Sequence, residues 1–119
     1  MSKKILIVDD NPNMSALLSE MLEIFEYDSI RAADGVEAIE KVELEDFSLV
    51  ITDMRMPKMS GLDLLQKIKR ERPELPVVVI SGYAIDDEGG NLLTSLADGF
   101  LNKPFKMCDI EKLLAQVLK

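Results

Sequence analysis

The chain has no histidine and a single cysteine among its 119 residues. Without histidine, the nitrogen ligand that zinc sites use most often is missing. Cys108 has no second cysteine to pair with, so an internal disulfide is excluded, which fits a reducing compartment. Zinc-dependent chemistry and a disulfide framework are therefore both unfavoured explanations for this sequence.

The N-terminal stretch MSKKILIVDD is also short of apolar residues, with only the run ILIV before two aspartates. Such a run is too short for a signal-peptide core or a membrane span. Basic residues are in the minority, 14 against 22 acidic ones, which gives a net charge of −8. Because negative charge opposes attraction to phosphate backbones and anionic lipid, we expect a cytoplasmic protein that binds neither nucleic acid nor membrane directly.

Internal repeats, low-complexity stretches and linkers are absent from the sequence. Its length is that of one ordinary domain, and its 47% apolar content is enough for a hydrophobic core. We therefore expect residues 1–119 to form one domain, with no second domain attached.

Apolar runs of strand length alternate with segments of helical period, which is typical of βα units that build a parallel sheet. The expected strands are residues 4–8, 29–33, 48–52, 77–80 and 99–101. The expected helices begin with an apolar stripe from Met14 to Phe25 and continue at 35–45, at 62–70, at 88–97 and around 110–117. Gly89 and Gly90 weaken the fourth helix, because each glycine costs about 1 kcal/mol relative to alanine.

Strands buried on both faces are continuously apolar, whereas edge strands tolerate polar residues. The first, third and fourth strands contain the apolar runs ILIV, LVI and VVVI, whereas the second contains Ser29 and Arg31 and the fifth is short. With right-handed crossovers this pattern predicts a five-stranded parallel sheet of order 2-1-3-4-5, an α/β doubly wound domain of the flavodoxin-like kind.

In such sheets ligands bind beyond the carboxyl ends of the strands. Asp9 and Asp10 follow the first strand, Asp53 the third, Ser81 the fourth and Lys103 the fifth. Three carboxylates brought together repel one another unless a cation neutralises them, and oxygen ligands favour a hard ion such as Mg²⁺. With a lysine and a hydroxyl nearby, the edge could hold a phosphoryl group, and its nucleophile would be a carboxylate.

Four motifs occur in the order that this fold requires: VDD at 8–10, DMRMPKMSG at 53–61, SGY at 81–83 and DGFLNKPF at 98–105. Together they resemble the receiver domains of two-component response regulators, over essentially the whole chain. Any one of the motifs alone would be weak, but the set is specific.

The resemblance implies a role for each site residue. Asp53 would be the phosphoacceptor, and Lys103 would pair with the phosphoryl oxygens. Asp10, Asp53 and the backbone carbonyl of Arg55 would bind Mg²⁺ directly, with Asp9 close by and often acting through water.

Activation is also implied by the resemblance. Ser81 and Phe100 match the hydroxyl and aromatic switch residues of the family, although many relatives have tyrosine where this chain has Phe100. The phosphoryl donor would be a sensor histidine kinase or a phosphotransfer protein. The receiver of the signal would be an unknown downstream protein or output domain, and a phosphorylation-dependent dimer is compatible with the scheme.

Each residue also has a simpler structural interpretation. Asp10 and Asn11, ahead of Pro12, could cap the first helix, and Phe100 could be an ordinary core residue. Cys108 is most simply a buried small apolar side chain.

Two other functions stay open at this point. The chain could be an interaction module with an inactive pocket. It could also be a phosphohydrolase with an aspartyl nucleophile, although such an enzyme is expected to carry a second aspartate two residues later, where this chain has Arg55.

Overall fold

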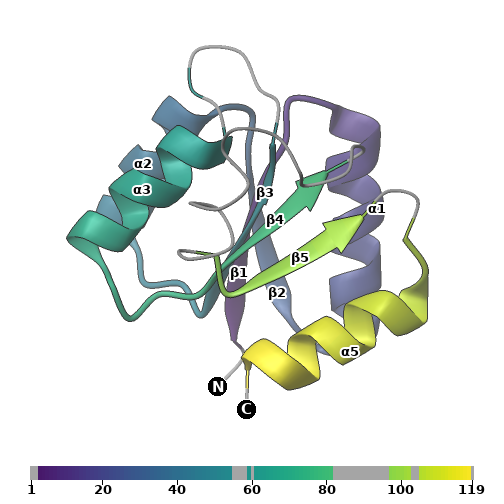
Figure 1. Cartoon of the computed structure of the whole chain (residues 1–119). Helices are drawn as coiled ribbons and strands as arrows, with labels where there is room; N and C mark the ends of the chain where they lie inside the picture. Colours follow the sequence, from purple (N-terminus) through teal and green to yellow (C-terminus); the bar gives the residue numbers. More distant parts are fainter. Residues whose placement is uncertain (1–2, 55–58, 60, 82–96, 103–104, 119) are drawn as a thin grey trace.

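The computed structural model describes residues 3–54, 59, 61–81, 97–102 and 105–118, without the side chains of residues 81 and 102. Its strands and helices alternate along the chain (Figure 1). They are β1 (Lys4–Val8), α1 (Pro12–Ile24), β2 (Asp28–Ala32), α2 (Gly35–Leu44), β3 (Leu49–Asp53), α3 (Gly61–Glu71), β4 (Val77–Ser81), β5 (Gly99–Asn102) and α5 (Met107–Val117). The expected strands are confirmed to within two residues; apart from Ala97, the expected fourth helix lies outside the described residues.

The strands form one parallel sheet of order β2-β1-β3-β4-β5, as the apolar pattern predicts. The side chains of β1 are buried from Ile5 onward, whereas β2 at the edge exposes Asp28 and Arg31. All strands point the same way, so their carboxyl ends share one edge of the sheet (Figure 1). The start of β1 and the end of α5 lie beside one another at the opposite edge (Figure 1).

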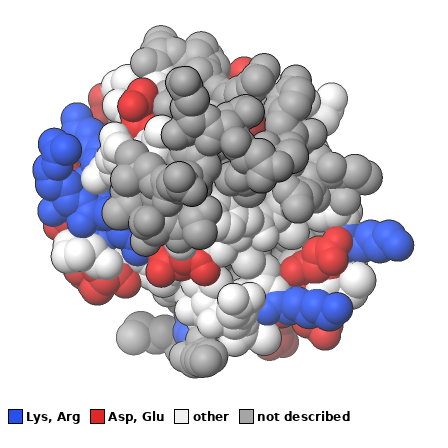
Figure 2. All heavy atoms as spheres, viewed as in Figure 1, with Lys and Arg blue, Asp and Glu red and all other residues white. Residues whose placement is uncertain are grey.

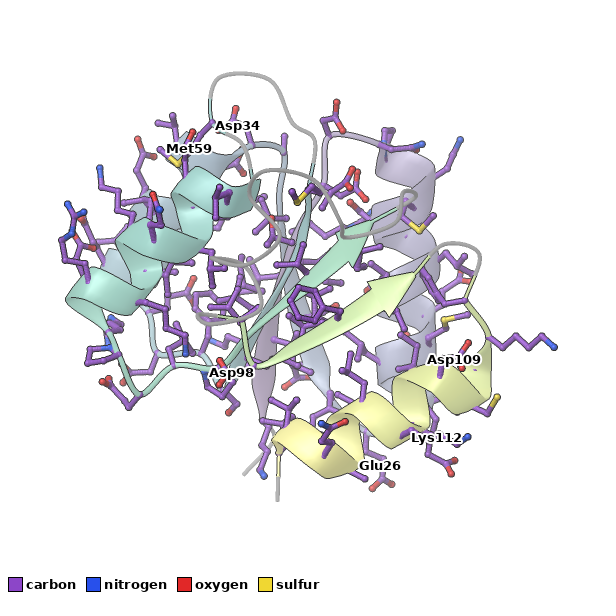
Figure 3. The ribbon with its side chains drawn as sticks, in the orientation of Figure 1. Glu26, Asp34, Met59, Asp98, Asp109 and Lys112 are labelled. Atoms are coloured by element: carbon purple, nitrogen blue, oxygen red, sulfur yellow. The ribbon has the colours of Figure 1, made fainter. Side chains whose placement is uncertain are left out.

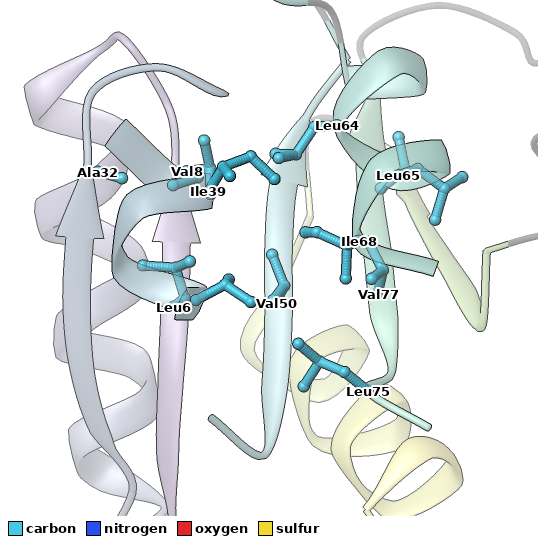
Figure 4. Packing of buried hydrophobic residues seen from close by; sticks show 13 residues of the cluster. Leu6, Val8, Ala32, Ile39, Val50, Leu64, Leu65, Ile68, Leu75 and Val77 are labelled. Atoms are coloured by element: carbon cyan, nitrogen blue, oxygen red, sulfur yellow. The ribbon is translucent and has the colours of Figure 1, made fainter. Parts of the chain in front are cut away.

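Two hydrophobic clusters hold the helices against the sheet. On one face, α2 and α3 cover alternate residues of the strands, and Leu6, Val50 and Val77 meet Ile39, Leu64 and Ile68 there (Figure 4). On the other face, α1 and α5 cover the residues between, such as Ile7 and Ile51. Because strand side chains alternate between faces, both faces of the central strands are buried.

Three apolar residues differ from expectation because the buried stripe of each helix is narrower than the sequence pattern suggests. Leu17, within the expected apolar stripe from Met14 to Phe25, and Val36, an apolar residue of the expected helix at 35–45, are 42% and 44% exposed. Each lies one residue from the buried stripe of its helix, or about 100° around the axis. Cys108, expected to be buried, is exposed because it lies two residues before Ile110 on α5.

Hydrogen bonds at helix starts fix where the chain turns away from the sheet. Asp34 caps α2 by accepting from the backbone N–H of Glu37 at 2.9 Å, and the Glu37 carboxylate accepts in return from Ala33 N at 3.3 Å. Asp109 similarly accepts from Lys106 N at the start of α5 at 2.8 Å. These hydrogen bonds satisfy backbone donors at the starts of α2 and α5.

Within the described part of the chain, every helix is too short or too polar to cross a lipid bilayer.

Candidate metal centre

The acidic residues after β1 and at the end of β3 are neighbours in the sheet. Val8 is paired with Thr52, so the next residue on each strand, Asp9 and Asp53, falls at the same level. Carboxylate oxygens of Asp9, Asp10 and Asp53 all lie within 4.8 Å of one another. The prediction that these three acids converge is confirmed.

Asp9 is the buried member of this acid cluster, which we define as Asp9, Asp10 and Asp53. Its side chain accepts a hydrogen bond from Asn11 N at 2.9 Å, and its own N–H donates to Ala32 O at 3.1 Å. Asp9 is only 4% exposed, whereas Asp10 is exposed to solvent. The turn after β1 therefore holds one carboxylate inside and presents the next one outward.

Asn11, rather than Asp10, is the N-cap of α1. The Asn11 side chain accepts from the backbone N–H groups of Asn13 and Met14 at 2.9 and 3.3 Å, and Pro12 takes the first helical position. The capping interpretation is therefore correct for Asn11 and not for Asp10. Capping by Asn11 fixes the entry into α1 and leaves Asp10 at the mouth of the acid cluster.

Asp53 is the half-buried last residue of β3. One of its carboxylate oxygens, Oδ1, accepts from Met54 N at 2.8 Å, and the same N–H also donates to Ile80 O at 3.0 Å. The hydroxyl of Thr52, a fully buried residue, donates to the Asp53 carbonyl oxygen at 3.0 Å. The backbone around Asp53 is therefore tied both to β4 and to its own side chains.

The donor set of the acid cluster fits a hard divalent cation. At about 4.8 Å, two carboxylate charges repel by about 1 kcal/mol in bulk water and by roughly 3–4 kcal/mol at an effective dielectric constant of 20. A cation between the three groups removes that repulsion, and three oxygen ligands suit Mg²⁺ or Ca²⁺ better than softer metals. The sequence offers no histidine to turn the site toward zinc.

Open space adjoins the acid cluster on the side of β2. A hollow of about 420 Å³ is lined by Asp9, Asp10, Pro12, Ser15, Arg31, Ala32, Ala33 and Glu37. It runs from the acid pair to the N-terminal ends of α1 and α2. A group that approaches Asp10 from solvent therefore meets a recess and not a flat surface.

The other predicted site residues are placed in part. Ser81 ends β4 one residue beyond Ile80, the partner of Asp53, so its backbone lies at the same edge. Phe100, on β5, is paired with Val79 of β4. It is partly buried against the core cluster on the face of α2 and α3. Arg55 and Lys103 lie outside the described residues, as does the side chain of Ser81.

The contacts that two residues, Thr52 and Gly61, make near Asp53 were not predicted from the sequence, although Gly61 is part of the motif at 53–61. Thr52 donates to the Asp53 carbonyl, and Gly61, the first residue of α3, donates from its N–H to Met54 O at 2.9 Å. The signal for Thr52 was a hydroxyl at the end of an otherwise apolar strand. The signal for Gly61 was a glycine at the start of a helix, where a capping residue is more common.

Comparison with known proteins agrees with the geometry. A profile described as "Response regulator receiver domain" matches residues 5–115. The chain is 38% identical over 117 residues to the response regulator protein PilR of Pseudomonas aeruginosa, covering 98% of this chain and 26% of PilR. The chain spans between 9% and 50% of the length of the first curated relatives that it matches.

Two solved structures are similar to this chain over nearly their whole length. The chemotaxis protein CheY4 of Vibrio cholerae has a TM-score of 0.90 at 28% identity, with 98% of this chain and 99% of that chain covered. The response regulator TrrA of Thermotoga maritima, solved in complex with Mg²⁺ and BeF, has a TM-score of 0.89 at 30% identity, with 97% and 98% covered. Because the profile match covers residues 5–115, this chain belongs to the response regulator receiver domain family.

Proposed function

We propose that Asp53 accepts the phosphoryl group in this chain, and that Asp9, Asp10 and Asp53 hold the Mg²⁺ that the reaction needs. Receiver domains are phosphorylation-activated switches of two-component systems. The observation that carries the residue assignment is the approach of three carboxylates to within 4.8 Å at the carboxyl edge of the sheet. On this proposal residues 1–119 act as one receiver domain in the cytoplasm.

The proposed chemistry divides the work among few residues. A carboxylate oxygen of Asp53 attacks phosphorus as the bond from phosphorus to the donor's imidazole nitrogen breaks, giving an acyl phosphate. Bound Mg²⁺ supplies the positive charge that offsets the carboxylates and the phosphoryl oxygens. Asp10 and Asp53, with the Arg55 carbonyl, are the proposed direct ligands; the hydrogen bond from Asn11 N keeps Asp9 beside them as an outer partner.

Lys103 and Ser81 are the proposed partners of the phosphoryl oxygens. Movement of the Ser81 hydroxyl toward the new phosphate then lets Phe100 turn inward. A phosphate that gains charge-assisted hydrogen bonds can supply the few kcal/mol that such a population shift needs. Because Phe100 has no hydroxyl, its inward position depends on packing alone. On this proposal the chain catalyses its own phosphorylation and presents an altered surface to a downstream partner.

The Mg²⁺ requirement gives the direct test of this function. Incubation with acetyl phosphate and Mg²⁺ should add one phosphoryl group to the chain, seen by intact-mass spectrometry. Excess EDTA should reduce the labelling rate on the order of a hundredfold or more, because three carboxylates then repel the incoming anion unscreened, and added Mg²⁺ should restore it. A labelling rate that does not change with EDTA would rule out the metal-assisted mechanism. Repeated turnover of a small phosphate ester would instead favour a phosphohydrolase.

We propose that a phosphoryl donor protein contacts α1, whose N-terminal end lines the hollow beside Asp10. Leu17 and Met14 are the apolar candidates on this helix for contact with a kinase or a phosphotransfer protein. Leu17 is 42% exposed, which supports this use, whereas the next residue, Leu18, is 1% exposed and belongs to the core. We therefore propose Leu17 as a docking residue.

Leu17→Asp should slow transfer from a phosphorylated histidine phosphotransfer protein that labels the wild-type chain, by about tenfold or more, since it buries a charge at the contact. The rate with acetyl phosphate should not change, because a small donor needs no docking surface. Leu44→Asp is the matched control, since Leu44 is 83% exposed on α2, on the other face of the sheet. Equal slowing of both donors, or of both variants, would remove Leu17 from the docking surface.

A further inference from the structure

Gly61 touches the backbone that carries Asp53. A Cβ atom built on Gly61 would lie 2.5 Å from Asp53 O, 2.9 Å from Met54 Cα and 3.2 Å from the Asp53 carbonyl carbon. Real Cβ atoms essentially never come within 3.0 Å of another heavy atom. All three neighbours are backbone atoms, so a side chain here would force the backbone at Asp53 and Met54 and the start of α3 apart.

Conformational freedom does not explain this glycine. Among the residues that the structure describes, the left-handed region contains Glu26, with φ 67°, and no glycine. Gly61 is instead the first residue of α3, buried between that helix and the end of β3. The close approach of the two backbones is therefore the reason for glycine at this position.

Hydrogen bonds connect this contact to the Asp53 carboxylate through a single residue, Met54. Gly61 N donates to Met54 O at 2.9 Å, which holds the residue after Asp53 against the start of α3. Met54 N in turn donates to Asp53 Oδ1 at 2.8 Å and to Ile80 O at 3.0 Å. A shift of Met54 thus changes the donor that orients the Asp53 side chain.

We propose that Gly61 is a positioning residue for the phosphoacceptor: its missing side chain sets where the Asp53 carboxylate lies relative to Asp9 and Asp10. The inference rests on the proposed function of Asp53. It adds that the spacing of the acid cluster is fixed from the start of α3 as well as from the strands. Gly61 acts through Asp53 and touches neither the metal nor the phosphoryl group.

The other described glycines provide matched comparisons. A Cβ on Gly99 would meet Leu113 Cδ1 at 2.9 Å, the far end of a flexible side chain. A Cβ on Gly35 would meet atoms of the Met59 side chain at 2.8–2.9 Å, and Met59 lies beside the α2 cap residue Asp34 (Figure 3). Gly99 begins β5, at the edge of the sheet away from the acid cluster, so it is the better control for stability.

The test compares Gly61→Ala with Gly99→Ala, after the wild-type chain has been shown to bind Mg²⁺ and to label with acetyl phosphate. Both variants should lose stability in urea. Only Gly61→Ala should also weaken Mg²⁺ binding by about tenfold or more and slow labelling on the order of a hundredfold. If the wild-type chain fails to label, the proposed function is wrong; if it labels and Gly61→Ala matches Gly99→Ala in both site measurements, the positioning role is wrong.

A second measurement covers the case in which Gly61→Ala does not fold. In the wild-type chain, Mg²⁺ titration should shift the backbone amide resonances of Met54 and Gly61 together, with the same apparent affinity. The amide of Gly99 should move little. Binding of Mg²⁺ without a response at Met54 and Gly61 would overturn the proposal, because it would show that this backbone is not coupled to the cluster.

Discussion

Asp53→Asn should take up no phosphoryl group from acetyl phosphate under conditions that label the wild-type chain fully. The amide of asparagine has no anionic oxygen to attack phosphorus, and the substitution removes one of the three charges proposed to hold the cation. Asparagine has nearly the same shape and keeps an oxygen for the Met54 N–H, which Asp53 Oδ1 accepts at 2.8 Å. We therefore expect a folded protein with an inactive site.

Intact-mass spectrometry measures this result directly, and Asp28→Asn is the matched control. Asp28 is exposed at the first position of β2, at the opposite edge of the sheet, and its carboxylate is remote from the acid cluster. Asp28→Asn should label at the wild-type rate. If Asp53→Asn were labelled as fast as the wild-type chain, the phosphoacceptor would be another residue and the site assignment would be wrong.

Asp98→Ala should lower the free energy of unfolding by about 2–3 kcal/mol, because it removes the acceptor of the Val77 N–H and the anionic partner of the partly buried Lys69. Asp98 Oδ2 accepts from Lys69 Nζ at 2.6 Å and from Val77 N at 2.8 Å. The Lys69 side chain is only 14% exposed and also donates to Leu75 O at 2.8 Å. One carboxylate therefore joins the end of α3 to the starts of β4 and β5 (Figure 3).

Urea denaturation followed by circular dichroism measures the loss, and Asp46→Ala is its control. Basic side chains gather over α3 (Figure 2), and Arg72, just beyond this helix, lies 3.4 Å from Asp46, which is 97% exposed. Solvent screens that pair, so Asp46→Ala should change stability by less than about 0.5 kcal/mol. Equal effects of the two variants would mean that Asp98 contributes no more than a surface charge.

The sheet was predictable because its strands differ in how much of them is buried. ILIV in β1 and VVVI in β4 are apolar on both faces, which only a central strand of a covered sheet allows, and Arg31 in β2 indicates an edge. With the strand order known, the residue after each strand falls at one edge. The meeting of Asp9, Asp10 and Asp53 follows from that arrangement and from no local pattern.

Contacts between distant segments were not predictable in the same way. The approach of Gly61 to Asp53 depends on how closely the start of α3 packs against the end of β3, which the spacing of apolar residues does not encode. Leu17 and Cys108 were misjudged because apolar character marks residues that can be buried, and the exact rotation of a helix on the sheet decides which ones are. Asp98 drew attention only as part of a motif, although its role is to join three elements.

The start of β1 and the end of α5 lie side by side, so a further domain joined to either one would be attached at the same place on this domain (Figure 1). A domain attached there lies on the side of the molecule opposite the acid cluster. The proposed phosphoryl donor protein could then reach the acid cluster without contacting the attached domain, whichever end carries that domain. The domain could be moved from the front of one polypeptide to the back of another with its reactive face still open to solvent.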